Sequence, residues 1–381
     1  MKATAQDASL LTVTVEGQEL TGWESYSYHA GIDVMPWQIT VTATLHQPGG
    51  SSLNLQEGMA ARVKLGDDLL LTGYLVTIAE NISARAHSLS LLIASKTLDL
   101  TDCSGSLVTS DLNIGNNESS GRSLVDMMGL VCKPFGVAVT ADQGLDNPVI
   151  PFFAINLTET PYAIIDRLCR QVGVIFTDTP EGNVRLVKVG STSPSAALAY
   201  GDTIEEYSEQ RSTDGRYSVI RAVLQTSQLL SQEPDSADYV SQVKASESGR
   251  EAHDPGIARN RPLLIPVDLG DANFEVAARR VLWEVARRSG RASPITVTVS
   301  GHRDASQALY RPNQPVTLTR PDGSTVERIV SSVNLIGGVS GRRASLTLLT
   351  AESLQPQPIV NRLTQKGGVA AQEDSMRAAG P

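Results

Sequence analysis

The first hundred residues alternate between apolar and polar positions over short runs. Leu10–Val15 and Gln38–Leu45 place an apolar side chain at every second position, as half-buried antiparallel strands do. Tight turns such as Gly66-Asp67-Asp68 separate the runs. Similar runs are found at Glu19–Tyr28, Ala61–Leu65, Leu69–Glu80 and Ser88–Ser95. About six short strands joined by tight turns predict a β-barrel domain over residues 1–100.

A helical period replaces the alternation after a connector rich in Ser, Asn, Asp and Gly. Apolar side chains between Leu124 and Val131 recur at i, i+3, i+4 and i+7, which predicts an amphipathic helix followed by a strand. The pattern then repeats: Thr160 is placed to cap a second helix, Pro161 takes its first position, and Gly173 ends it. These two helix–glycine–strand units predict a small α/β domain over residues 101–200.

Strand-like alternation returns in the last part of the chain. Strands are predicted at 203–207, 217–225, 295–299, 315–319, 326–336 and 344–350. Between them, Ser227–Asn260 is polar and predicts a long loop, and Asp271 is placed to cap a helix that runs to about Ser289. We therefore predict a second barrel from residues 201–230 and 293–352, interrupted by a loop-plus-helix subdomain at 231–292. Residues 353–381 are predicted to form an arm or a disordered tail.

Composition supports a mainly β fold with α+β parts, and it narrows the possible functions. The net charge of −9 is spread along the chain, whereas a protein that grips nucleic acid needs a basic groove. The three cysteines, Cys103, Cys132 and Cys169, match no metal-binding spacing, and we interpret them as reduced, small apolar residues. We expect neither a signal peptide in residues 1–20 nor a membrane-spanning segment.

The sequence contains no arrangement of residues that is typical of catalysis or of metal or cofactor binding. The five histidines are scattered, and no His-Glu-x-x-His, nucleophile-elbow or phosphate-loop motif is present. We expect His302, which follows a predicted strand end, to form hydrogen bonds in a turn. Glu205, Glu206 and Asp102 are expected to be solvated carboxylates. No catalytic residue, metal ligand or cofactor is therefore predicted.

The densest basic run lies on the predicted helix that ends near Ser289. Three readings remain open: a solvated helix face, which is preferred, a docking face for an acidic partner, or a nucleic-acid contact. Glu275 with Arg279 and Glu284 with Arg288 are spaced as helical ion pairs. Trp283 lies off the main apolar stripe, and core packing is preferred for it over a place at an interface. The candidate docking residues are Arg279, Arg280, Arg287, Arg288 and Arg291.

Several short stretches follow one another in a particular order along the chain: Gly17–Trp23, Leu71–Leu75, Ile93–Cys103, Arg261–Leu263, Gly301–Asp304 and Arg311–Asn313. In this order and spacing they resemble the baseplate hub proteins of Mu-like contractile-tailed phages. The resemblance extends to about Leu349. Gln307–Tyr310 departs from the family pattern, in which a Gly and a Trp are expected, and this departure puts the local turn shape in doubt.

The resemblance implies a structural, non-enzymatic protein with two tube-type barrel domains. Such hubs are homotrimers whose six barrels form a pseudo-hexameric ring between the hexameric tail tube and the trimeric central spike. It further implies contacts with tube-initiator and baseplate wedge proteins, DNA passing through the lumen, and no membrane insertion. The expected location is the tail baseplate of the virion, after assembly in the host cytoplasm. Two alternatives remain: a tail-associated cell-wall hydrolase, and a tube-initiator or distal tail ring protein.

Overall fold

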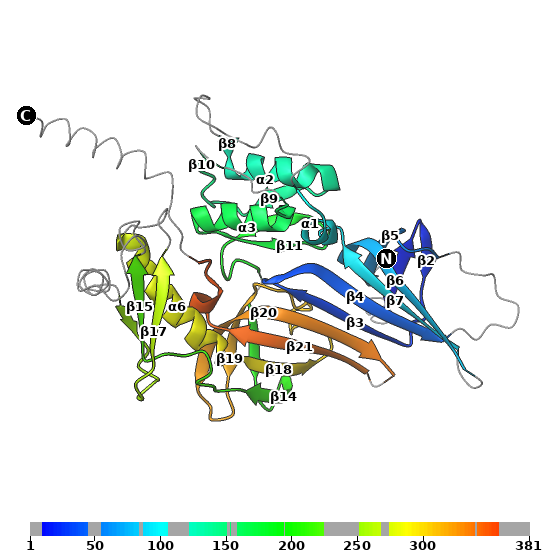
Figure 1. The fold of residues 1–381 in the computed structure, drawn as a ribbon. Helices are drawn as coiled ribbons and strands as arrows, with labels where there is room; N and C mark the ends of the chain where they lie inside the picture. Colours follow the sequence, from blue (N-terminus) through cyan, green and yellow to red (C-terminus); the bar gives the residue numbers. More distant parts are fainter. Residues whose placement is uncertain are drawn as a thin grey trace, which may run out of the picture.

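A computed structural model describes residues 10–44, 55–83, 87–105, 122–150, 153, 158–193, 195–224, 251–267, 274–339 and 341–357. One large sheet forms the body of the molecule, and two smaller parts that contain helices lie beside it (Figure 1). One small part carries α2 and α3, and the other carries α6. The predicted mainly β class is confirmed.

The first seven strands, here called unit 1, follow the predicted alternation closely. Val13, Ile39 and Leu91 face the core and are fully buried. Glycines in the left-handed region, Gly17 and Gly66, make the turns that join β1 to β2 and β5 to β6. The strands are β1 (Leu11–Val15), β2 (Gln18–Leu20), β3 (Ser25–Gly31), β4 (Val34–Thr44), β5 (Ala60–Leu65), β6 (Asp68–Ile82) and β7 (His87–Ser95).

Six later strands, here called unit 2, repeat the plan of unit 1. Their order β14-β18-β21-β20-β19-β13 matches β3-β4-β7-β6-β5-β1 strand for strand. The long strands shift register at equivalent places, β6 against β7 at Leu75/Thr77 and β20 against β21 at Val330/Ser332. β13 pairs with β19 in parallel, whereas β1 pairs with β5 antiparallel. The bounds are β13 (Ala196–Ala199), β14 (Ile204–Glu209), β18 (Ile295–Ser300), β19 (Pro315–Thr319), β20 (Thr325–Gly338) and β21 (Gly341–Leu349).

The duplication is also visible in the sequence once the registers are known. Ile39 and Ile295 hold equivalent places, since they pair with Ile93 of β7 and Leu348 of β21. Each begins the same tetrapeptide, Ile-Thr-Val-Thr. Equivalent positions can therefore be assigned across the two units, and these assignments are used below.

The two units share one sheet and one core instead of forming two separate closed barrels. β20 of unit 2 pairs with β3 of unit 1 over seven residue pairs, from Ser332 with Gly31 to Gly338 with Ser25. The strands of units 1 and 2 consequently form a single 13-stranded sheet whose main pairing path ends at β14 and at β2. One apolar cluster spans both units. The two predicted β-barrel domains are therefore parts of one continuous sheet in the described residues. The β20–β3 seam that joins them links segments some 300 residues apart, which local sequence patterns do not reveal.

The small α/β domain has its own apolar core between the two predicted helices and a three-stranded sheet. The Thr160 hydroxyl accepts a hydrogen bond from the backbone N–H of Ala163, and Gly173 ends α3 in the left-handed region, as predicted. The elements are α1 (Leu98–Asp102), β8 (Arg122–Ser123), α2 (Leu124–Cys132), the 3-10 helix η4 (Lys133–Phe135), β9 (Val139–Ala141), β10 (Val149–Ile150), α3 (Pro161–Val172), β11 (Ile175–Asp178) and β12 (Val184–Val187).

The helix-containing subdomain is an insertion between β14 and β18 of unit 2. Strands β15 (Val219–Leu224), β16 (Glu251–His253) and β17 (Pro262–Val267) form a separate sheet, and α6 (Phe274–Arg291) packs on it. The 3-10 helix η6 (Ala351–Leu354) contacts α6 after the last strand.

Two strands lie in other parts of the molecule than predicted. β15 was expected in the second barrel but pairs with β16 and β17. Residues 196–199 were assigned to the α/β domain without a predicted strand, and they form β13, which pairs with β19. Alternation identifies a strand without naming its partner, which explains the difference for β15. Most of the predicted loop, the cap at Asp271 and the tail beyond residue 357 lie outside the described residues.

Candidate functional site: an assembly surface

The arginines of α6 do not form one free basic face. Arg280 and Arg288 both bind the buried Glu284 carboxylate, at 3.1 and 2.8 Å, so the predicted Glu284–Arg288 ion pair is confirmed. Arg291 pairs with Asp33 in the β3–β4 turn of unit 1, and Arg279 is exposed. The side chain of Glu275 lies outside the described residues. The docking role of the five arginines stays a prediction, and the structure brings four of them to the side of α6 that faces the rest of the chain.

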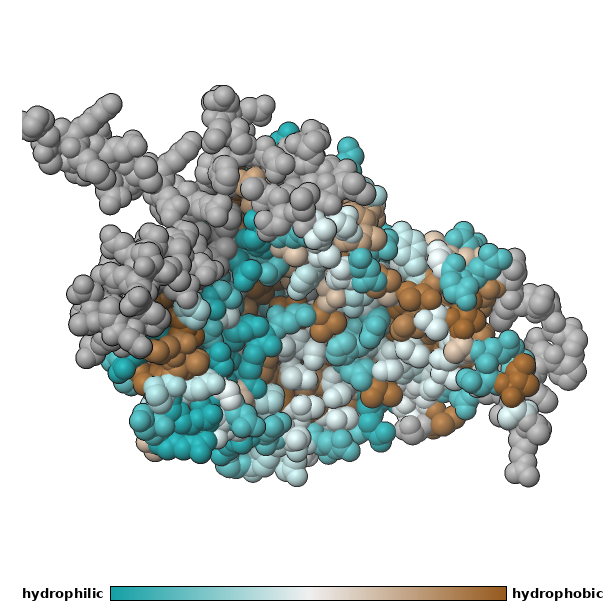
Figure 2. Space-filling view, in the orientation of Figure 1, coloured by the Kyte–Doolittle hydropathy of each residue, from teal (hydrophilic) through white to brown (hydrophobic). Residues whose placement is uncertain are grey.

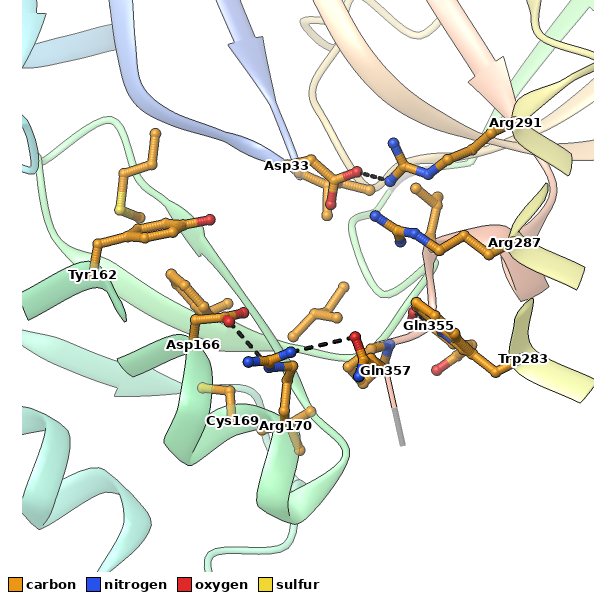
Figure 3. Close-up of a pocket in the computed structure, with 17 residues that line it drawn as sticks. Asp33, Tyr162, Asp166, Cys169, Arg170, Trp283, Arg287, Arg291, Gln355 and Gln357 are labelled. Atoms are coloured by element: carbon orange, nitrogen blue, oxygen red, sulfur yellow. Dashed lines mark hydrogen bonds and ion pairs between the residues drawn. The ribbon is translucent and has the colours of Figure 1, made fainter. Parts of the chain in front are cut away.

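Arg287 lies in a hollow of about 340 Å³ between α3, α6, the β3–β4 turn and the segment after η6 (Figure 3). Its Nη1 donates to the Ser353 carbonyl at 3.5 Å. Burial lowers the pKa of Arg287 and raises that of Asp166 on the opposite wall. The Trp283 indole donates to the Gln355 carbonyl at 2.8 Å, with Arg280 and Arg287 over its ring. Trp283 therefore packs where subdomains meet, and not in a core as preferred from the sequence.

A buried carboxylate joins the α/β domain to unit 1. Asp178, at the end of β11, accepts hydrogen bonds from the Thr97 hydroxyl at 2.6 Å and the Ser95 hydroxyl at 3.0 Å. It also accepts from the backbone N–H groups of Trp37 at 3.0 Å and Thr179 at 2.8 Å. Burial raises the pKa of Asp178 to about 6, against the lowering effect of these donors. Sequence reasoning missed this residue because one aspartate after a strand resembles an ordinary turn residue.

Within the described ranges, no group of three or more His, Cys, Asp and Glu side chains is arranged to hold a metal ion. Of the helices described, none combines the length and the apolar character needed to cross a bilayer. His302 forms a hydrogen bond in a turn, as expected. Its Nε2 donates to the Ile336 carbonyl at 3.0 Å. Its ring packs near Tyr26 at the seam between the units.

Two open edges of the described part of the large sheet are related by the duplicated plan, whereas β2 and β13 lie at its other edges. Beyond Leu75, β6 pairs only with β7, and β14 pairs only with β18 among the named strands. The core-facing side chains at these edges, Ile78 and Tyr207, are only partly buried. Their equivalents at the filled seam, Val333 and Tyr26, are 0% and 8% exposed. Each open edge therefore has the character of a seam that lacks its partner strand.

Eight neighbouring strands, from β14 to β6 in sheet order, present a polar face opposite the core. Most side chains there are Ser or Thr, and the charged ones are Glu206 and Arg343, with Glu205 bound to Arg343. The area over β3, β4, β20 and β21 is largely pale in Figure 2, the colour of intermediate hydropathy. We call it the hydroxyl face, formed by Ser25, Ser27, His29, Gln38, Thr40, Thr42, Thr77, Ala79, Asn81, Ser88, Ser90, Leu92, Glu206, Ser208, Thr296, Thr298, Ser300, Ser332, Asn334, Ile336, Arg343, Ser345 and Thr347.

Comparison with known families shows which proteins this chain is similar to. The family model "Mu phage baseplate assembly protein GpP-like, N-terminal" matches residues 10–92. The model "Baseplate hub protein gp44-like, second domain" matches residues 97–188. By these two matches the chain is similar to phage-tail baseplate proteins.

A relative of known function is the baseplate hub protein gp44 of Escherichia phage Mu, which is 24% identical over 366 residues. The match covers 95% of this chain and 93% of that protein. The resemblance to Mu-like hub proteins is thereby confirmed.

Solved structures share the fold. The 43 kDa tail protein of prophage MuSo2 from Shewanella oneidensis has a TM-score of 0.75 at 22% identity. The match covers 92% of this chain and 100% of that chain. A tail protein from Neisseria meningitidis has a TM-score of 0.73 at 18% identity, covering 92% and 99%. A component of the E. coli type VI secretion system has a TM-score of 0.53 at 8% identity, covering 89% and 76%.

Proposed function

We propose that three copies of this chain close into a ring that forms the hub of a contractile tail baseplate. The ring joins the hexameric tail tube and its initiator proteins to the trimeric central spike, contacts wedge proteins at its outside, and leaves a channel for DNA. Its role is structural and not enzymatic. The observation that carries the proposal is the pair of open edges, one of each kind needed to repeat the seam already present inside the chain.

The seam inside the chain supplies the geometry for the contact between chains. There, β20 of unit 2 pairs with β3 of unit 1. In the duplicated plan β6 is equivalent to β20, and β14 is equivalent to β3. The free part of β6 in one copy can therefore pair with β14 of the next. Equivalence places Ala79 opposite Gln210, as Asn334 lies opposite His29 within the chain.

Such a contact is heterologous, because each copy offers β6 at one side and β14 at the other. Heterologous contacts close into a ring when the rotation between copies permits it. Each copy contributes two similar units, so three copies present six units to a six-fold tube and three-fold symmetry to a trimeric spike. The match to the baseplate hub protein gp44 of phage Mu over most of its length supports the proposed place in a baseplate hub.

The dimensions of this ring suit a channel. Each chain contributes the eight strands from β14 to β6, and three times eight strands spaced by about 4.8 Å give a diameter of roughly 37 Å between backbones. Side chains that extend about 5 Å from each wall leave an opening of roughly 27 Å, and strand tilt widens it further. A nucleic-acid duplex fits within that width.

The mass of the purified full-length chain tests the assembly. Light scattering should give three times 40.6 kDa, with a central hole in negative-stain images. Ile78→Asp, which puts a carboxylate on the open β6 edge, should give monomers. A wild-type chain that stays monomeric with the spike and tube proteins present would contradict the proposal. Turnover of purified peptidoglycan by the chain would contradict its non-enzymatic part.

A further inference from the structure

In the proposed ring, the structure of the sheet determines which of its two faces lines the channel. The core lies on one face of the eight strands, and outer strands of both units, such as β5, β1 and β19, pack beyond it. Packed sheets lie about 10 Å apart, so six such layers cannot fit inside an opening of roughly 27 Å. The core and outer strands must therefore lie outside, and the hydroxyl face must line the channel.

This face lacks the groups that hold DNA. Affinity for the duplex comes mainly from Lys and Arg that neutralise phosphates and release counterions. The hydroxyl face carries no lysine, and its single arginine, Arg343, already binds Glu205 at 2.8 Å. Burial lowers the pKa of His29, which favours its neutral form. The face holds few carboxylates that could repel DNA: Glu205 is paired with Arg343, and Glu206 accepts a hydrogen bond from the Thr298 hydroxyl at 3.3 Å.

Hydroxyls exchange hydrogen bonds between water and phosphate with little net gain. Four of them even form a continuous row across unit 2, where Ser208, Thr296, Thr347 and Ser332 are successive cross-strand partners. We propose that this hydroxyl face is a neutral lining along which duplex DNA slides, and that neither attraction nor repulsion by charge governs the passage. Contact between DNA and the ring is then weak and insensitive to salt.

The test places charge on the lining without altering the ring. Thr40→Lys with Thr296→Lys changes equivalent positions of the two units and puts six lysines at one level of the channel. The ring is held by an Ala79→Cys and Gln210→Cys cross-link in a Cys103→Ser background, so that ring formation is scored separately. Gln18→Lys with Ala60→Lys, at exposed positions on the outer strands β2 and β5, adds the same charge as a control. Binding of a short DNA duplex is followed by fluorescence anisotropy over a salt series.

The unmodified ring and the outer control should bind the duplex weakly. The Thr40 and Thr296 variant should bind at least tenfold more tightly at low salt, with log K falling as log salt rises by up to about 0.9 per phosphate neutralised. Tight, salt-dependent binding by the unmodified ring would overturn the inference, and so would equal gains in the outer control. Failure of the cross-link to form a ring would instead refute the proposed assembly, on which this inference rests.

Discussion

The filled seam and the open edges of this chain are formed by equivalent strands: β20 and β3 at the seam, and β6 and β14 at the open edges. At the seam, β20 and β3 hydrogen-bond to each other and bury Val333 completely. At the open edge of β6, the equivalent Ile78 is only partly buried, and Ile82 further along is 73% exposed. The comparison teaches that, in the proposed assembly, duplication of a β unit supplies an interface within a chain and its counterpart between chains. Folding completes the first seam, and we propose that a second copy completes the other.

The two units also differ in what closes the end of their sheet. Unit 1 is capped by the α/β domain, through the hydrogen bonds of Asp178 to Ser95 and Thr97. Unit 2 is capped by its own insertion, because α6 brings Gly290 against Thr350 and Ser353. Thr350 is equivalent to Ser95 in the duplicated plan. Similar strands therefore accept different partners at the same end.

The largest expected effect comes from the filled seam. Val333→Asp buries an unpaired carboxylate in the shared core, and we expect a loss of about 4 kcal/mol or more in the free energy of unfolding. Ile78→Asp, the equivalent change at the open edge, should cost the monomer roughly 1 kcal/mol or less. Urea denaturation of both variants under monomeric conditions measures the difference. Equal losses in the free energy of unfolding would contradict the account that one edge is filled and the other is open.

The cap of unit 1 should depend on pH. Burial raises the pKa of Asp178 to about 6 from an ordinary value of 3.8, so the folded state binds this proton more tightly than the unfolded state. The stability from this group is fully present below pH 4 and falls by roughly 3 kcal/mol as pH rises through 6. Asp178→Asn should remove this slope. Urea denaturation between pH 4 and 7 checks it, and parallel curves for the two proteins would count against it.

The cap of unit 2 should be sensitive to one methyl group. A Cβ at Gly290 would meet the Ser353 Cβ at 2.5 Å and the Thr350 hydroxyl at 2.6 Å. Gly290→Ala should therefore destabilise the protein by about 1–3 kcal/mol. Gly129→Ala is the matched control, because that position in α2 has no atom within 4 Å and should gain up to about 1 kcal/mol. Thermal unfolding of both variants measures the contrast; a stabilised Gly290→Ala would contradict the packing.

The smallest effect is expected where the insertion of unit 2 meets the β3–β4 turn of unit 1. Arg291 and Asp33 are both partly exposed, and such ion pairs contribute less than about 1 kcal/mol. Arg291→Ala should lower the stability by no more than that, and less still in high salt. A loss of several kcal/mol in urea denaturation would mean that this ion pair holds the insertion in place.

Local sequence patterns predicted most of the elements but not their long-range partners. The α3 helix has its cap at Thr160, its first-turn proline at Pro161 and its closing glycine at Gly173, and each behaves as expected. The β20–β3 seam depends on pairing between distant segments, to which alternation is indifferent. The ion pairs of α6 show the same limit. The Glu284–Arg288 pair within the helix was predicted, whereas the pair of Arg291 with Asp33 was not, because Asp33 belongs to a distant turn. The Ile-Thr-Val-Thr repeat at residues 39–42 and 295–298 is the one signal in the sequence that could have revealed the duplication.

Cross-linking at the open edges tests the central claim most directly. Paired strand positions lie within disulfide range, so Ala79→Cys with Gln210→Cys in the Cys103→Ser background should oxidise to covalent trimers. His29→Cys with Asn334→Cys, the equivalent pair at the filled seam, should form the same bond within one chain and leave the mass unchanged. A ladder that ends at the trimer on a denaturing gel is the predicted result. Single chains without the cross-link, beside a fully oxidised control, would contradict the account.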